Sequence, residues 1–165
     1  HFLYFRKDLI DQLLKDDAWK KKYAEIAKEK LGMEMQPKAP ADWTWDDFVA
    51  TALFFTKSIN PDSPVPYGTV LQMKNLLFNI MVFEGAAASY GGNWLDKDGK
   101  VIVDSEAWRK ALDIYKKIAD AEATPGDSNS YEYAEANAAF GTGKVAFMPQ
   151  WSAADRKSTR LNSSH

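Results

Sequence analysis

Residues 138–151, AAFGTGKVAFMPQW, join the end of a helix pattern to a strand pattern and indicate the fold class. The apolar run at 144–148 predicts a buried strand. A helix over residues 130–140 is expected to end at the glycine that follows it. Working outward from this stretch, residues 2–5 and 67–71 are further predicted strands, separated by helix patterns. Strands that alternate with helices indicate an α/β domain.

Local signals mark the other helices. Asp16 and Thr44 are expected to cap two helices at their N-termini, and Gly32 is expected to end the first of them. Residues 74–84 are apolar nearly all round, which predicts a deeply buried helix that ends at Gly85. The sequence therefore predicts a helix-rich domain around a small sheet.

The region after residue 90 contains a turn signal and a strongly amphipathic helix. Asp98-Gly99 lies between short apolar runs and predicts a hairpin. Ser105 is expected to cap a helix with a continuous apolar stripe. Five side chains on helix stripes are expected to belong to the core of the domain: Trp45, Phe48, Trp108, Leu112 and Tyr115.

The composition excludes several classes of function. The chain has 165 residues and a net charge of −2, which argues against a nucleic-acid binder. It has no cysteine, so a disulfide scaffold, a thiol nucleophile and a cysteine-ligated metal are excluded. Its two histidines are the first and last residues, which argues against a catalytic triad or a histidine-rich metal site. No apolar run reaches roughly 18 residues, so we expect no membrane-spanning helix.

Aromatic side chains make up 13% of the chain, more than a core of this size needs. Some of these rings are therefore expected to face a ligand.

Three short motifs resemble functional sites but fit a structural role better. Residues 141–144, GTGK, lack the upstream glycine and the following Ser or Thr of a phosphate loop. Residues 96–99, DKDG, lack the acidic residues that the ends of a calcium loop require. Asp46 and Asp47 are neighbours at a helix start, where carboxylates complement the helix dipole, so they do not form a pair of glycosidase carboxylates.

A series of weak motifs becomes specific because its members occur in a fixed order. Together they resemble the family 1 extracellular solute-binding proteins, the sugar-capturing subunits of ABC importers of the maltose-binding type. The matching segments are FRKDL (5–9), TWDDF (44–48), YG (67–68), YGG (90–92), DGKV (98–101) and AAFGTGKVAFM (138–148), followed by Trp151.

The resemblance implies a periplasmic-binding-protein-like (type II) α/β fold with two lobes and a cleft between them. Residues 1–154 are then expected to be most of the second lobe only. The implied function is a carbohydrate receptor that delivers a sugar or oligosaccharide to the permease subunits of an ABC transporter. It also implies a monomer without catalysis, metal or cofactor, located in the periplasm or outside the cell and membrane-anchored if it is a lipoprotein.

The resemblance also places a ligand beside the turn that follows the strand starting at Tyr67. Gln72, Lys74 and Asn75 lie in that turn, in agreement with the rule that open α/β sheets bind ligands beyond the carboxyl ends of their strands. The amides of Gln72 and Asn75 can both donate and accept hydrogen bonds, as sugar hydroxyls require. A helix cap is the alternative role for Asn75, and a solvated charge is the alternative for Lys74.

Two aromatic residues complete the predicted site. Trp151 matches the family tryptophan whose indole stacks on a sugar ring, and a core position is the alternative. Tyr90 is expected either to reach the cleft or to cap the buried helix. The ligand-binding candidates are therefore Gln72, Lys74, Asn75, Tyr90 and Trp151.

Residues 155–165, DRKSTRLNSSH, match the translation of a common sequencing adapter. We therefore expect them to be a non-biological tail, and we expect the natural part of the chain to be truncated at both ends.

Two other functions are compatible with the sequence. One is a carbohydrate-active enzyme domain of α/β type, and the other is an interaction domain that uses the helix at 16–31 as its contact surface.

Overall fold

The computed structural model describes residues 2–75 and 77–154. Among these residues, the strands form one mixed sheet in the order β1-β3-β2. Its members are β1 (Phe2–Phe5), β2 (Tyr67–Thr69) and β3 (Val145–Gln150). β3 lies in the centre, antiparallel to β1 and parallel to β2. The expected α/β architecture is confirmed.

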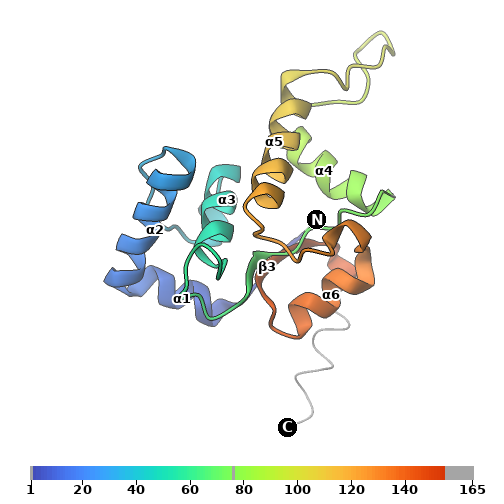
Figure 1. Cartoon of the computed structure of the whole chain (residues 1–165). Coiled ribbons are helices and arrows are strands. Elements are labelled where there is room, and N and C mark those ends of the chain that lie inside the picture. The colour runs from blue at the N-terminus through green and yellow to red at the C-terminus, as the bar shows by residue number, and fades with distance from the viewer. Residues whose placement is uncertain (1, 76, 155–165) are drawn as a thin grey trace.

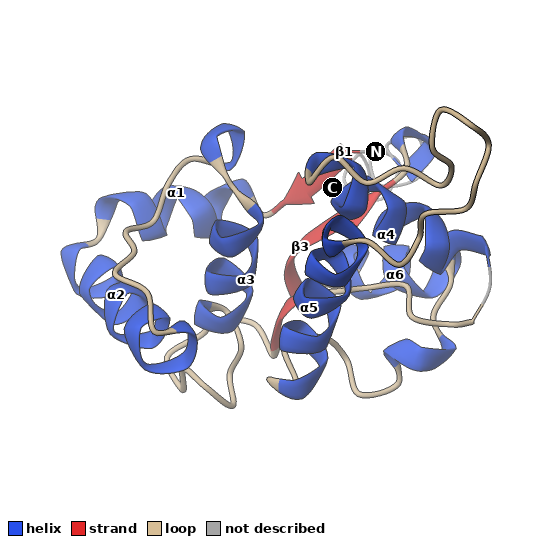
Figure 2. Ribbon diagram, turned by 90° about the horizontal axis from the view of Figure 1, so that it is seen from above, coloured by secondary structure: helices blue, strands red, loops and turns tan. Residues whose placement is uncertain are grey.

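Helices surround this small sheet (Figure 1). Figure 2 shows α1, α2 and α3 to one side of β3, and α4, α5 and α6 to the other. No helix in the described part of the chain is both long and apolar enough to cross a membrane. The helices are α1 (Lys7–Lys15), α2 (Asp17–Leu31), α3 (Trp45–Phe54), α4 (Leu77–Ser89), α5 (Glu106–Asp120) and α6 (Tyr133–Gly141).

The caps predicted at Asp16, Gly32 and Thr44 form as expected, whereas Ser105 lies at the N-cap position of α5 but its side chain makes no capping hydrogen bond. The Asp16 side chain accepts hydrogen bonds from the first turn of α2, and Gly32 ends that helix with a left-handed φ of 68°. Thr44 and Asp47 form a reciprocal capping box at the start of α3. These three signals are local, which is why the sequence alone located them.

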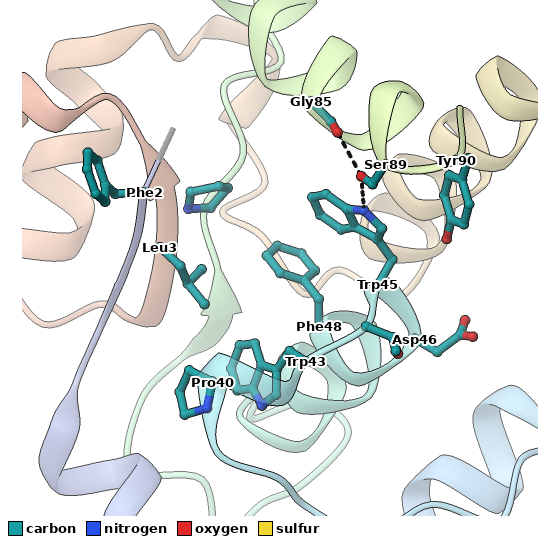
Figure 3. A pocket seen from close by; sticks show the side chains of 12 residues that line it. Phe2, Leu3, Pro40, Trp43, Trp45, Asp46, Phe48, Gly85, Ser89 and Tyr90 are labelled. Atoms are coloured by element: carbon teal, nitrogen blue, oxygen red, sulfur yellow. Dashed lines mark hydrogen bonds between the residues drawn. The ribbon is translucent and has the colours of Figure 1, made fainter. Parts of the chain in front are cut away.

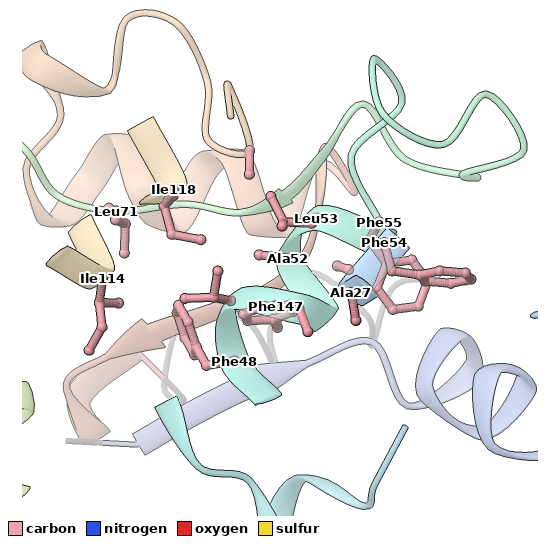
Figure 4. Close-up of a cluster of buried hydrophobic side chains, with 14 of the residues drawn as sticks. Ala27, Phe48, Ala52, Leu53, Phe54, Phe55, Leu71, Ile114, Ile118 and Phe147 are labelled. Atoms are coloured by element: carbon pink, nitrogen blue, oxygen red, sulfur yellow. The ribbon is translucent and has the colours of Figure 1, made fainter. Parts of the chain in front are cut away.

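The core is centred on β3 (Figure 4). The ring of Phe147 packs edge-on against Phe48 of α3, with centroids 4.9 Å apart. On the other face of the strand, Met148 packs with Ala136 and Ala139 of α6. Since neighbouring residues of a strand point to opposite faces, β3 is covered on both sides. The predicted core residues Phe48, Trp108 and Tyr115 are buried.

The two other predicted core residues differ from each other. The Leu112 side chain is 59% exposed, because the buried face of α5 is centred on Ala111, Ile114 and Ile118. Leu112 lies outside that face, so its assignment to the core was wrong. Trp45 is half-buried at the edge of the core, where its ring packs against Phe48, and its indole Nε1 donates to the Ser89 hydroxyl over 2.7 Å.

Helix α4 departs from its predicted bounds. It continues past Gly85 to Ser89, because one glycine costs a helix only about 1 kcal/mol and the residues after it favour helix. The chain leaves the helix at Gly91, whose φ is 82°, and the Gly92 N–H bonds back to the Ala87 carbonyl. The expectation of deep burial is also wrong at Ile80, which is 44% exposed. The side chains of residues 76–78, 81 and 82 lie outside the described part.

Other predicted elements are shorter in the structure. The strand expected over 67–71 ends at Thr69, and the helix expected from residue 130 begins at Tyr133. The predicted hairpin has a single antiparallel bridge, Leu95 to Val101, with Gly99 in the left-handed turn position. The expected tail at 155–165 lies outside the described residues.

Candidate functional site

Three side-chain amides from distant parts of the chain form a hydrogen-bonded series at the end of β3. Gln72 Nε2 donates to Gln150 Oε1 over 2.8 Å, and Gln150 Nε2 donates to Asn137 Oδ1 over 3.1 Å. Gln72 is 2% exposed and Gln150 is 0% exposed. Gln72 Oε1 and Asn137 Nδ2 are also buried and have no hydrogen-bond partner among the described residues. This amide series therefore has an unpaired acceptor at one end and an unpaired donor at the other.

Trp151 is attached directly to the amide series. Its backbone N–H donates to Gln150 Oε1 over 3.0 Å, and its carbonyl accepts from the Tyr4 hydroxyl over 3.1 Å. The side chain is half-buried, so part of the residue reaches the surface beside the amides. The structure thus brings together two of the predicted site residues, Gln72 and Trp151, through the intervening Gln150.

Lys74 forms an ion pair with Glu132 at 2.5 Å, just before α6. The hydrogen bond that the Lys74 ammonium donates to this carboxylate raises the pKa of Lys74 above its ordinary value. The side chain of Lys74 remains 47% exposed. Lys74 is therefore a positive charge fixed in place at the surface, rather than a freely solvated one.

The loop that carries Lys74 is anchored to the loop before α6. The Met73 N–H donates to the Ser128 carbonyl and the Lys74 N–H donates to the Tyr131 carbonyl, at 3.1 and 3.3 Å. The Thr124 hydroxyl accepts from the Leu71 N–H over 3.2 Å. These bonds hold the loop that leaves β2 against the loop that enters α6.

Asn75 lies in an exposed turn next to Lys74. It is thus at the surface on the same loop as Gln72 and Lys74, two residues before α4 begins.

Tyr90 lies in a different place. It lines a pocket of about 810 Å³ together with Trp43, Trp45 and Phe48 (Figure 3). Pro149 of β3 also lines this pocket, whereas the next residue, Gln150, bonds to α6. Because successive strand residues face opposite sides, the pocket and the amide series lie on opposite faces of β3. The structure therefore does not join Tyr90 to the other predicted site residues.

The sequence reasoning missed three residues that the structure adds to the site. Gln150 lies two residues beyond the predicted strand, and its position directly before Trp151 was a usable signal. Asn137 is a polar residue between the buried alanines Ala136 and Ala139 of α6, which was a second signal. Glu132, the partner of Lys74, gave no signal because the two residues are 58 positions apart.

The arrangement suits a neutral, hydrogen-bonding ligand. Each amide presents both donor and acceptor atoms, as paired hydroxyl groups require. An indole beside such groups can cover an apolar face of the same ligand.

Comparison with known proteins identifies the family and the fold of the chain. A family model described as bacterial extracellular solute-binding protein matches residues 2–161. Among solved structures, maltose-bound T. maritima MalE3 is 27% identical, with a TM-score of 0.64 over 94% of this chain and 33% of that chain. An ABC transporter solute-binding protein from Agrobacterium vitis S4 with bound D-mannitol is also 27% identical, with a TM-score of 0.64 over 92% of this chain and 30% of its own length. No curated protein matches the chain.

A third solved structure supports the fold alone. The ribitol complex of a solute-binding protein from Agrobacterium radiobacter K84 is 24% identical, with a TM-score of 0.63, and the match covers 92% of this chain and 31% of that chain. The chain thus spans about a third of the length of these relatives and has part of the type II periplasmic-binding-protein fold. The family is one of extracellular binding proteins rather than of enzymes. The chain belongs to the bacterial extracellular solute-binding protein family.

Proposed function

We propose that this chain is part of a receptor that binds a sugar or a polyol and delivers it to the permease of an ABC importer. The observation that carries the proposal is the amide series at the end of β3, with Trp151 attached to it. Buried amides beside a half-buried indole match a ligand with hydroxyl groups on its edge and C–H groups on its face. The solved relatives with bound maltose and bound D-mannitol, each 27% identical, support the same class of ligand.

The proposed ligand contacts are Gln72, Lys74, Asn75 and Trp151, which lie on the loop after β2 and at the end of β3. Tyr90 belongs to the aromatic pocket on the other face of β3 and is a separate proposal, as a ring that contacts either a ligand or another part of the protein.

The proposed receptor has no catalytic role. The central polar groups of the site are amides, which do not exchange protons near neutral pH and so do not serve as a general acid or base. We place the receptor in the periplasm or at the cell surface, as a monomer that is membrane-anchored if it is a lipoprotein. Residues 1–154 correspond in this proposal to most of the second lobe, with the sugar held between two lobes.

The test is calorimetric titration of a protein of the relatives' length that carries this chain, with maltose, D-mannitol and related sugars as ligands. We expect saturable binding to at least one of them, with the ligand recovered unchanged. Formation of a new product would support the enzyme alternative, and the absence of binding across the panel would refute the receptor.

The chain alone is a useful control in the same titration. If the site is completed by a second lobe, residues 1–154 by themselves bind orders of magnitude more weakly than the longer protein, because closure supplies the remaining contacts and excludes water. Binding of equal strength by the chain alone would contradict the two-lobe proposal.

A further inference from the structure

A single backbone N–H determines which atom of each amide in the series donates and which accepts. The Trp151 N–H lies 3.0 Å from Gln150 Oε1 and must donate, so Gln150 has to present its oxygen there. The same oxygen accepts from Gln72 over 2.8 Å, which means that Gln72 contributes its NH₂ group to this contact. The Gln72 oxygen, Oε1, therefore faces away from Gln150, at one end of the series.

The same reasoning fixes the other end. With its oxygen committed to Trp151 and Gln72, Gln150 faces Asn137 with its NH₂ group, over 3.1 Å. Asn137 must then accept with Oδ1 and turn Nδ2 outward. An amide often has two equivalent orientations, but here a flip of any member would place two donors or two acceptors against each other.

The outward atoms of the two ends are Gln72 Oε1 and Asn137 Nδ2, and both are buried without a hydrogen-bond partner among the described residues. A buried polar group that stays unpaired costs about 1–3 kcal/mol, so such groups are normally satisfied by a bound molecule or by water. The two atoms differ in kind, one being an acceptor and the other a donor. A molecule that satisfies both must offer a donor to Gln72 and an acceptor to Asn137.

We propose that Asn137 and Gln150 are specificity-determining residues of the receptor, because the amide series that they complete offers a polyhydroxy ligand one acceptor, at Gln72, and one donor, at Asn137. A hydroxyl group can meet either end, whereas a ligand that has lost the matching hydroxyl leaves an amide unpaired. The inference rests on the proposed sugar or polyol receptor and deepens it.

The decisive variant is Asn137→Asp. It has nearly the same shape and keeps the oxygen that accepts from Gln150, but it replaces the outward donor with an acceptor. We expect its affinity for the ligand that the wild type binds to fall on the order of tenfold to a hundredfold near neutral pH. A role limited to holding Gln150 in place would leave the affinity unchanged.

Protonation of the introduced carboxyl should restore the ligand affinity that Asn137→Asp loses. Once protonated, the introduced carboxyl again carries a donor on the outward side, so binding by Asn137→Asp should recover as the pH falls through the pKa of that carboxyl. The charged groups at this end of α6 are Glu132, which is paired with Lys74, and Glu135, whose pKa is lowered by backbone hydrogen bonds at the start of the helix. Wild-type protein titrated over the same pH range corrects for these groups.

The experiment is calorimetry of wild type, Asn137→Asp and Thr142→Val in a protein of the relatives' length, with D-mannitol and maltose as probes at several pH values. Thr142→Val is the matched control, since the Thr142 hydroxyl bonds within α6 and not to the amide series. Thermal unfolding of each variant shows whether it is folded.

The possible results distinguish this inference from the proposed function. Weakened binding by Asn137→Asp that recovers at lower pH, with Thr142→Val unchanged, supports it. Wild-type binding that Asn137→Asp matches at every pH overturns it. Absence of wild-type binding to any sugar or polyol overturns the proposed function itself, and this inference with it.

Discussion

The backbone of Gly68 in β2 lies directly against the backbone of Ala52 in α3. A Cβ atom at Gly68 would be 1.9 Å from the Ala52 carbonyl oxygen, which is far inside van der Waals contact. Thr56 reinforces this approach, because its hydroxyl accepts from the Gly68 N–H and donates to the Ala52 carbonyl. Strand and helix therefore touch through backbone atoms, with no side chain between them.

Gly68→Ala should destabilise the fold strongly for this reason. The colliding atoms belong to the backbone of α3, which cannot rotate away, so we expect a loss of about 3 kcal/mol or more in the free energy of unfolding. Urea denaturation measures it. Gly126→Ala is the control, since no atom lies within 4 Å of its added Cβ, and should change stability by less than about 0.5 kcal/mol. Equal effects of the two substitutions would contradict the close packing of β2 on α3.

The buried carboxylate of Asp47 should make stability depend on pH. Burial tends to raise the pKa of Asp47, but hydrogen bonds from the Thr44 backbone and hydroxyl and from Lys38 outweigh it, and the net pKa is lowered. A group with a lowered pKa in the folded state stabilises the fold above its unfolded pKa of about 3.9. This stability is lost as the pH falls through the folded pKa.

Asp47→Asn should remove this contribution, so that its unfolding free energy varies less with pH below about 4 than that of the wild type. The measurement is urea denaturation at a series of pH values. Asp46→Asn, which removes the neighbouring charge and keeps the capping box, should follow the wild-type dependence. A wild type and an Asp47→Asn variant with parallel pH profiles would argue against this role for Asp47.

Two neighbouring apolar positions of α5 should respond very differently to truncation. The Trp108 side chain is 6% exposed, and its indole donates to the Asn93 carbonyl over 3.0 Å. Trp108→Ala should therefore cost roughly 3–5 kcal/mol in unfolding free energy. Leu112→Ala, one turn further on at a side chain that is 59% exposed, should cost less than about 0.5 kcal/mol. Thermal or urea unfolding compares them, and a Trp108→Ala loss below about 1 kcal/mol would place Trp108 at the surface.

Trp151 and Trp19 provide a matched pair for ligand binding. Trp151→Ala should weaken sugar affinity on the order of tenfold or more, because the proposed stacking surface is lost. Trp19 packs edge-on against Phe54, with centroids 5.3 Å apart, so Trp19→Ala should lower stability and leave the affinity intact. Calorimetry with the sugar that binds tests both. Equal losses of affinity would remove Trp151 from the site.

Much of the fold could be predicted because its signals are local. Asp16, Gly32 and Thr44 act on backbone groups within a few residues, so the sequence alone located the ends of their helices. Leu112 shows the limit of such reasoning. Its spacing fits an apolar stripe, but which part of α5 is buried depends on how α3 and α4 pack against it.

The site was predictable only in part for the same reason. Gln72 and Trp151 follow strands, and their positions could be inferred from the sequence pattern and the resemblance. The hydrogen bond that connects Gln72 to Gln150 spans 78 positions, and the bond to Asn137 requires α6 to lie against β3. Neither contact has a local signature, so the amide series became visible only in three dimensions.

The central position of β3 has a consequence for the order in which the protein folds. In the described part of the chain, both strand pairings involve β3, and Phe2 lies opposite Gln150. At about 5–20 residues per second, the ribosome needs on the order of ten seconds after making β1 to supply its partner. During that time the early helices can pack on one another through contacts close in sequence, whereas the apolar first strand has to wait. Synthesis of β3 then supplies the pairing partner of both other strands in the described part of the chain, and β1 stays unpaired within this sheet until that step.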